Sequence, residues 1–154
     1  MQTAISGSIT LKRASSIETG PSGPETAIQI TPRTAHIGAE IREVDLAHLD
    51  NETFAAIREA HLEWKVQVFR DQRLSCEEHK AFGRRFGASH VYPMHKERSA
   101  EPEVLTVKTT ADSAYTAGDG WHTDFTCDEL PQMGFLLHVK EVSPFGGDTV
   151  FADT

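Results

Sequence analysis

Apolar and polar residues alternate in several short stretches of the first half of the chain, and this pattern predicts β-strands. Residues 27–30 read Ala-Ile-Gln-Ile, and residues 37–41 form a second stretch that a glycine interrupts. Residues 66–69 read Val-Gln-Val-Phe, which is typical of a strand with one face buried. We therefore expect three short strands before residue 70.

A first helix is predicted between the second and third of these strands. Asp50 is a residue type that caps helix N-termini, because its carboxylate accepts hydrogen bonds from the exposed amides of the first turn. Phe54, Ile57, His61 and Trp64 follow at spacings of three, four and three, which places them on one helical face. His61 is therefore interpreted as packing at the edge of the core.

A second helix is predicted after the third strand. Ser75 and Glu78 have the spacing of a capping box, in which each side chain satisfies the other residue's amide. Phe82 and Phe86 share a face one turn apart, and Gly87 stands where a glycine cap ends many helices.

The second half of the chain has the pattern of strands. Residues 104–108 and 134–139 are β-prone or mostly apolar, residues 144–148 read as a turn, and another strand begins at Thr149. Helices in front and strands behind predict an α+β, mainly β architecture on an antiparallel sheet. The last strand is cut off almost at once, so we expect an incomplete domain with an open edge.

Composition narrows the class of protein. Residues 1–26 are rich in Ser, Thr and Gly and are expected to be a flexible leader, with residues 27–154 forming the domain portion. The net charge of −8 argues against a nucleic-acid partner, and no apolar run has the length of a membrane span. Cys76 and Cys127 lie far apart and suggest no disulfide framework, so a reducing, cytoplasmic location is expected.

The sharpest chemical motif is His122-Thr123-Asp124. On a strand, residues two apart point to the same face, so an imidazole and a carboxylate could reach one ion there. This pair is two-thirds of the facial triad of non-haem Fe(II) oxygenases. Taken alone, a His-x-Asp tripeptide is more often a surface or simple hydrogen-bonded pair, so the prediction depends on its context.

That context resembles the taurine/2,4-D dioxygenase family of Fe(II)- and 2-oxoglutarate-dependent enzymes. The resemblance extends from about Ile28 to the last residue. It is carried by five stretches in the family's order, namely residues 68–72 (Val-Phe-Arg-Asp-Gln), 86–87 (Phe-Gly), 121–126 (Trp-His-Thr-Asp-Phe-Thr), 129–134 (Glu-Leu-Pro-Gln-Met-Gly) and 146–149 (Gly-Gly-Asp-Thr).

The resemblance implies a double-stranded β-helix, or jelly roll, with flanking helices. It implies that His122 and Asp124 are the first two iron ligands and that Thr149 bonds a carboxylate of the cosubstrate 2-oxoglutarate. The structural reading of residues 146–149 is a plain hairpin turn, and both readings can hold together. The family's second histidine and its carboxylate-binding arginine would lie beyond residue 154, so we expect this polypeptide alone to be unstable or inactive.

Substrate contacts in this family come partly from the loop after Phe-Gly. By that match His90, Tyr92 and His95 are weak candidates to face a small organic substrate, which would react with dioxygen; surface roles are the alternative. Gly118 stands where taurine-specific members have an asparagine, which puts taurine in doubt. A homo-oligomer is compatible with the sequence.

Two other functions compete with the oxygenase. One is a non-catalytic binding module that keeps the front part of the fold. The other is a zinc hydrolase that uses His122, Asp124 and His138. A half-buried, hydrogen-bonded strand histidine is the plainer interpretation of His138.

Overall fold

The structure is a computed structural model that describes residues 28–91, 100–110, 112–114, 118, 120–124, 126 and 128–153. The chain divides into two compact units. We call the described residues of 28–73 and 151–153 the sheet unit, and those of 74–150 the α2 unit. Each unit is described by itself.

The sheet unit contains a three-stranded sheet in the order β1 (Gln29–Pro32), β2 (Ala39–Arg42), β3 (Gln67–Phe69). β1 and β2 are antiparallel, with Gln29 opposite Arg42, whereas β2 and β3 are parallel, with Ala39 opposite Gln67. The three predicted strands are therefore confirmed with small shifts of their ends. The expectation of an antiparallel sheet holds for β1 and β2 but not for β2 and β3, because a helix connects β2 to β3 and returns the chain in the same direction.

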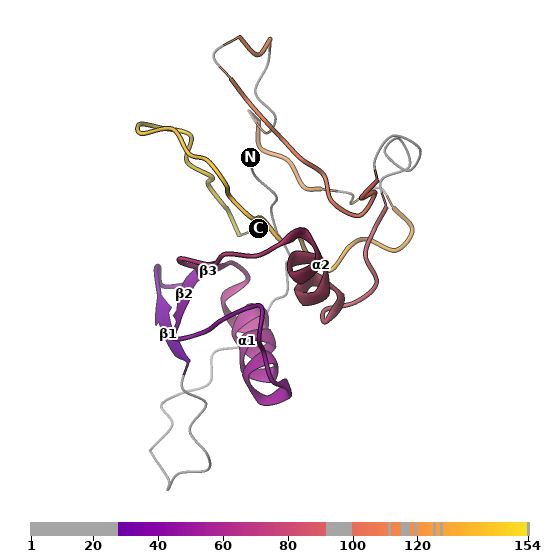
Figure 1. Cartoon of the computed structure of the whole chain (residues 1–154). Helices are drawn as coiled ribbons and strands as arrows, with labels where there is room; N and C mark the ends of the chain where they lie inside the picture. Colours follow the sequence, from indigo (N-terminus) through magenta and orange to yellow (C-terminus); the bar gives the residue numbers. More distant parts are fainter. Residues whose placement is uncertain are drawn as a thin grey trace, which may run out of the picture. The chain divides into compact units, whose positions relative to one another are not determined.

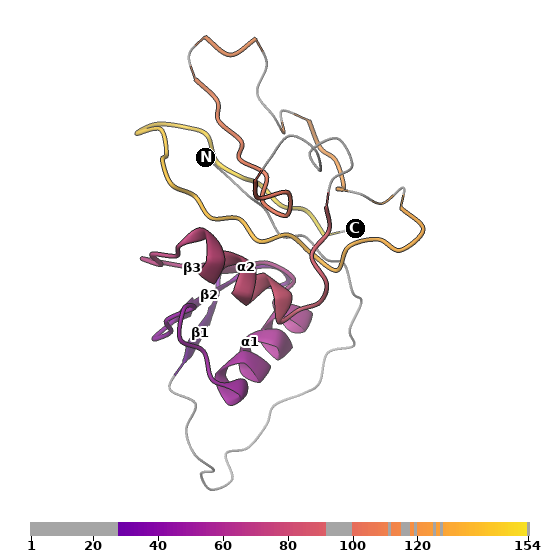
Figure 2. The ribbon, with the colours of Figure 1, turned by 45° about the vertical axis from the view of Figure 1, so that its right-hand side comes forward.

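That connecting helix is α1 (Asn51–Trp64), and it covers one face of the sheet (Figures 1 and 2). Its cap is the predicted one: the Asp50 carboxylate accepts a hydrogen bond from the Thr53 amide at 2.7 Å. Ile57 and His61 are buried, as the helical spacing predicted. The core of the unit consists of Ala39, Ile41, Leu46, Ile57 and Ala60.

A buried carboxylate lies in the middle of the sheet. Glu40 on β2 is only 1% exposed, and its charge is compensated by arginines from three segments. Arg42 Nε lies 2.6 Å from Glu40 Oε1, Arg33 contacts Glu40 Oε2, and Arg70 Nε is 3.8 Å from Oε2. Because an unpaired buried charge is very costly, these arginines allow a carboxylate in the central strand.

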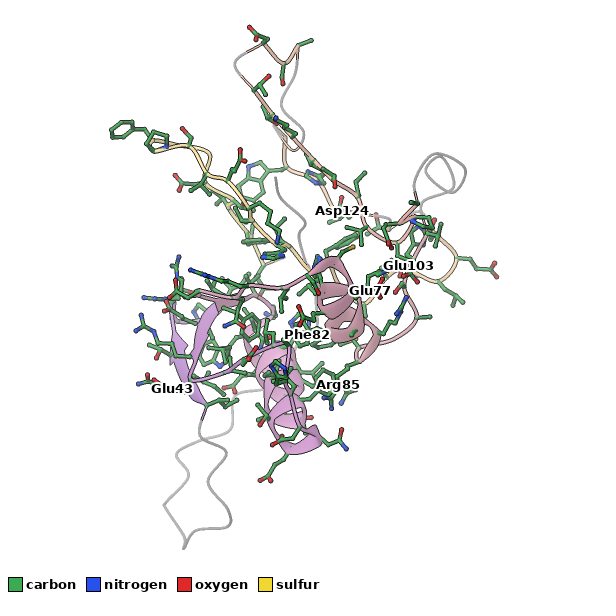
Figure 3. All side chains as sticks on the ribbon, in the orientation of Figure 1. Glu43, Glu77, Phe82, Arg85, Glu103 and Asp124 are labelled. Atoms are coloured by element: carbon green, nitrogen blue, oxygen red, sulfur yellow. The ribbon has the colours of Figure 1, made fainter. Side chains whose placement is uncertain are left out.

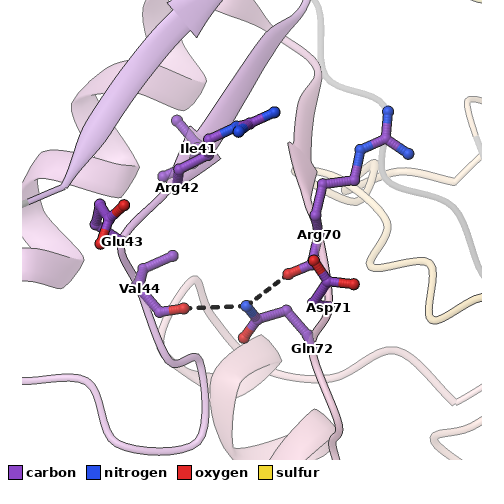
Figure 4. A pocket seen from close by; sticks show the side chains of 7 residues that line it. All are labelled: Ile41, Arg42, Glu43, Val44, Arg70, Asp71 and Gln72. Atoms are coloured by element: carbon purple, nitrogen blue, oxygen red, sulfur yellow. Dashed lines mark hydrogen bonds between the residues drawn. The ribbon is translucent and has the colours of Figure 1, made fainter.

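Gln72 joins the carboxyl ends of β2 and β3. Its amide nitrogen donates to the carbonyls of Val44 and Arg70, at 3.0 and 2.9 Å, and its Oε1 accepts from the Leu46 amide at 3.0 Å. Beside it is an open hollow of about 250 Å³ lined by residues 41–44 and 70–72 (Figure 4). None of the residues proposed from the sequence to bind a metal, cosubstrate or substrate lines this hollow.

The α2 unit begins with the second predicted helix, α2 (Cys76–Arg84). The capping box is confirmed, since the Glu78 amide donates to Ser75 Oγ at 3.2 Å and the Ser75 amide to Glu78 Oε2 at 2.8 Å. Gly87 is not the cap. The helix ends earlier, where the Arg85 and Phe86 amides donate short-range hydrogen bonds to the Phe82 and Gly83 carbonyls. These bonds satisfy the helix end, so no left-handed glycine is needed.

No described residue of the α2 unit lies in a hydrogen-bonded strand. The strands predicted at residues 104–108, 134–139 and from Thr149 are therefore not found among the described residues. Figure 1 draws residues 134–150 as a plain trace. A strand exists only with a ladder partner, and an extended apolar segment cannot supply one by itself. The small mixed sheet and two helices are therefore what these residues form, and a jelly roll is not visible among them.

Several predictions fall on residues outside the described ranges, namely the leader at 1–26, Tyr92, His95 and Cys127. Cys76 is exposed and forms no disulfide. Neither helix of the described residues combines the length and apolar character needed to cross a membrane.

Candidate active site

The side chains of His122 and Asp124 converge. His122 Nε2 lies 3.4 Å from Asp124 Oδ1, and the two side chains are 54% and 37% exposed (Asp124 is labelled in Figure 3). Residues 121–123 are irregular and Asp124 lies in a bend, so the strand that was expected to align them is absent. The bend brings the carboxylate back toward the imidazole in its place.

The other nitrogen of His122 is already engaged. Nδ1 lies 2.8 Å from the carbonyl of Gly120, and a carbonyl can only accept, so Nδ1 carries the proton and donates it. In the neutral imidazole the lone pair is then on Nε2, the atom that faces Asp124. A histidine that ligates a metal commonly has its ring fixed through such a bond on the far nitrogen.

Gly118 lies beside the imidazole. Its φ is +85°, in the left-handed region that favours glycine, and a Cβ built there would lie 3.8 Å from His122 Cε1. In the sequence, Gly118 was notable only because taurine-specific members of the family have an asparagine at its position. The structure places it against the ring of the first candidate ligand.

The pair can hold a cation between its two facing atoms. A lone pair and a carboxylate oxygen repel each other unless a proton or a metal ion lies between them. Ligand bonds of about 2.0–2.2 Å allow both atoms to reach one ion from a separation such as theirs. His122 and Asp124 thus fit two positions of a facial triad, and the described residues contain no group of three His, Cys, Asp or Glu that could complete it.

A second histidine–aspartate pair, in the sheet unit, shows the ordinary alternative. His48 Nδ1 lies 2.8 Å from Asp45 Oδ2, and the Ala47 amide donates to Asp45 Oδ1 at 2.9 Å. These bonds lower the pKa of the Asp45 carboxyl, and the bond with His48 contributes more than the one from Ala47. In this pair a hydrogen bond already joins the two side chains, which leaves no gap for an ion.

Thr149 follows a turn that requires glycine. Gly146 and Gly147 have φ values of +68° and +77°, and Ser143 Oγ donates to the Phe145 carbonyl at 2.8 Å. The turn predicted from Gly-Gly is therefore present, and it leads directly to the exposed Thr149.

His90 connects two segments of the α2 unit. Its Nδ1 is 3.1 Å from the amide nitrogen of Gln132 and 3.9 Å from Asp128 Oδ2. Both partners follow His122 and Asp124 closely in sequence, and neither was singled out from the sequence for this contact. The motif at residues 129–134 was the signal that could have found Gln132.

His138 lies against another histidine. Its ring centroid is 5.6 Å from that of His79 on α2, with the ring planes at 75°. His138 is half-buried, as the plainer interpretation predicted, and it belongs to no three-donor group of the described residues.

The site thus defines a candidate non-haem metal centre with one nitrogen and one oxygen ligand. The family model described as "Taurine catabolism dioxygenase TauD, TfdA family" matches residues 29–154. The chain belongs to this family, and the resemblance noted from its motifs is confirmed.

Individual relatives agree. The chain is 34% identical over 135 residues to an (S)-phenoxypropionate/alpha-ketoglutarate-dioxygenase of Sphingobium herbicidovorans, covering 82% of this chain and 45% of that protein. It is 32% identical over 136 residues to an alkylsulfatase of Acinetobacter baylyi, covering 85% and 41%. The chain therefore spans less than half the length of these curated relatives.

One solved structure, a taurine dioxygenase from Burkholderia xenovorans, matches 49% of this chain and 28% of its own with 42% sequence identity and a TM-score of 0.45. The family assignment rests on the sequence matches.

Proposed function

We propose that this chain supplies the front part of an Fe(II)- and 2-oxoglutarate-dependent dioxygenase, with a jelly-roll core, that hydroxylates a small organic substrate. The observation that carries the proposal is the convergence of His122 Nε2 and Asp124 Oδ1 at 3.4 Å, with His122 Nδ1 held by Gly120. Membership of an α-ketoglutarate-dependent family supports it.

The roles of the residues follow from their chemistry. His122 offers a neutral nitrogen and Asp124 an anionic oxygen, and together they would hold Fe(II) while leaving one side of the ion open. The hydroxyl of Thr149 would donate to a carboxylate of 2-oxoglutarate. Gly146 and Gly147 set the turn that presents this hydroxyl.

Bound iron and 2-oxoglutarate supply the oxidising chemistry, with dioxygen as oxidant and succinate and carbon dioxide as co-products. The chain's contribution is to orient the groups around that centre. Gly120 keeps the proton on Nδ1 of His122, so that the lone pair of the neutral ring lies on Nε2, which faces Asp124. Where the hydroxylated carbon also carries a heteroatom, the product can fragment.

The substrate class is proposed from the relatives. Their names include phenoxypropionate and sulfonate dioxygenases and an alkylsulfatase, so small organic anions are the first compounds to test. His90 is a weak candidate for a substrate contact, because Gln132 already engages its Nδ1. Tyr92 and His95 are equally weak candidates. A reducing cytoplasmic location is proposed with this activity.

Metal binding by the chain itself tests the proposal without requiring turnover. Mn²⁺ added to the isotopically labelled chain should broaden the NMR signals of His122 and Asp124 before any others. His122→Ala should abolish that broadening. Binding is expected to be weak, since two ligands hold a metal less well than three.

The matched control is His48→Ala, which removes the histidine of the hydrogen-bonded pair and should leave Mn²⁺ binding unchanged. Broadening centred on His48 and Asp45, or none that depends on His122, would overturn the metal assignment and favour the binding-module alternative. Succinate release after anaerobic Fe(II) loading tests the oxygenase directly, and tight zinc with hydrolysis would favour the hydrolase.

A further inference from the structure

His79 is a buried polar residue on the face of α2 that also carries the core residue Phe82. Its Nε2 lies 3.3 Å from the carbonyl oxygen of Leu136, so Nε2 carries a proton and donates to that oxygen. Leu136 belongs to the apolar segment that was predicted to be a strand. The side chain of His79 thus satisfies a carbonyl that a neighbouring strand would otherwise have satisfied.

Alternate residues of this segment contact the same helix or Leu74, which lies just before the helix cap Ser75. The ring of His138 lies edge-on to that of His79 at 5.6 Å, and Lys140 Nζ donates to the carbonyl of Leu74 at 3.1 Å. Leu136 approaches Gly83 so closely that a Cβ built there would lie 4.0 Å from Leu136 Cδ2. Residues 136, 138 and 140 are two apart, and their contacts attach this segment to α2 and to Leu74.

The surroundings of His79 favour its neutral form. Burial lowers the pKa of His79, and the nearby His138 and Lys140 lower it further, against the Leu136 carbonyl, which raises it. Lys80, the next residue of α2, forms ion pairs with Glu77 and Glu101, each at 2.5 Å. Arg84 forms an ion pair with Glu103 at 2.6 Å (Glu77 and Glu103 are labelled in Figure 3). The two groups that act electrostatically on His79 are His138 and Lys140, and both are basic.

We propose that His79 is a positioning residue, which holds residues 134–140 on α2 through its bond to Leu136 and its ring contact with His138. This segment connects Asp124 to the turn before Thr149, so its placement affects the metal pair and the cosubstrate threonine together. The inference rests on the proposed function for those roles. The attachment of residues 134–140 to α2 depends only on the contacts that α2 makes with them.

Protonation of His79 should release the segment. At pH values well above 6.5 the ring is neutral and the fastening is complete. As the pH falls below 6.5, a charge on His79 would lie beside His138 and Lys140 in a buried place. The contact with Leu136 is then lost, because hydration stabilises the charged ring more than its interactions in this buried position do.

NMR contacts within the chain test this. Nuclear Overhauser effects between the His79 and His138 rings, and between Gly83 and the Leu136 methyls, are expected at neutral pH and should disappear on acidification. His79→Ala should lose the Gly83–Leu136 contact at every pH. His79→Gln, which keeps an N–H donor without a titrating ring, should retain it and make it independent of pH.

His48→Gln, at an exposed histidine of the sheet unit, is the control and should change nothing in residues 134–140. Retention of the Gly83–Leu136 contact in His79→Ala, or its persistence after His79 is protonated, would overturn the positioning role.

A second measurement connects the fastening to the site. With Mn²⁺ at His122 and Asp124, the broadening of the Thr149 methyl signal should change at least about twofold in His79→Ala, because relaxation depends steeply on distance, and should be restored in His79→Gln. Unchanged broadening would overturn the link to the cosubstrate turn. If Mn²⁺ fails to bind at His122, the proposed function fails, while the contacts of His79 still decide its positioning role.

Discussion

The sheet unit and the α2 unit draw on similar residues but reach different degrees of order. In the sheet unit, strands pair over a few residues, a capped helix covers them, and Ile57 is fully buried. In the α2 unit only α2 is regular among the described residues, and large apolar side chains are exposed, including Phe145 at 89% and Leu130 at 83%.

The two units differ in regular structure because of the separation along the chain between segments that could pair as strands. In the sheet unit residues 33–38 connect β1 to β2 and residues 43–66 connect β2 to β3, so the entropy of closing each connection is small. The apolar segments of the α2 unit have no ladder partner among the described residues, and helix α2 holds them instead. The candidate chemistry lies in this second, less regular unit.

The largest expected effect is on the core of the sheet unit. Ile57→Ala removes a fully buried side chain between α1 and the sheet and should lower the free energy of unfolding by about 3 kcal/mol. Urea titration would measure it. Glu59→Ala, on the exposed side of α1, should change the free energy of unfolding by less than about 0.5 kcal/mol. Equal losses in both variants would contradict the assignment of the core.

Ion pairs in the two units should contribute differently to the free energy of unfolding, because the pair in the sheet unit is buried and the pair in the α2 unit is exposed. Glu40→Ala removes the buried carboxylate from three arginines and should cost about 2 kcal/mol of unfolding free energy, because hydrogen bonds to charged groups are lost in a buried place. Arg84→Ala removes an exposed partner of Glu103 in the α2 unit and should cost less than about 1 kcal/mol. A larger loss for Arg84→Ala in the same urea assay would reverse this ranking.

The two helix caps should have equal energies but separate effects. Asp50→Ala and Ser75→Ala each remove a side chain that accepts an amide of the first turn, and each should cost about 1 kcal/mol. Amide hydrogen exchange should speed up in α1 for the first variant and in α2 for the second. Faster exchange in both helices from either variant would show that the units unfold together.

The smallest effect expected is a pH dependence in the sheet unit. Burial lowers the pKa of His61 below 6.5, so the unfolded chain binds more protons than the folded chain just below that pH. The stability that comes from keeping His61 neutral is complete above pH 6.5 and is lost as the pH falls below it. His61→Leu should flatten the slope of unfolding free energy against pH in this range, and an unchanged slope would assign it to other groups.

Features that depend on neighbouring residues could be predicted from the amino-acid sequence. Asp50 and the Ser75–Glu78 box predicted both helix starts, and Gly-Gly predicted the turn before Thr149, because caps and turns are satisfied within four residues. The five stretches that resemble the dioxygenase family, taken together, also predicted the family, which the comparison confirmed.

Contacts between distant residues could not be predicted and became known from the fold. It made β2 and β3 parallel, placed three arginines around Glu40, and set His79 against Leu136 and His138. It brought His122 and Asp124 together through a bend rather than a strand. These contacts join residues whose spacing gives no periodic signal, since their energy comes from burial and from pairing groups on separate segments.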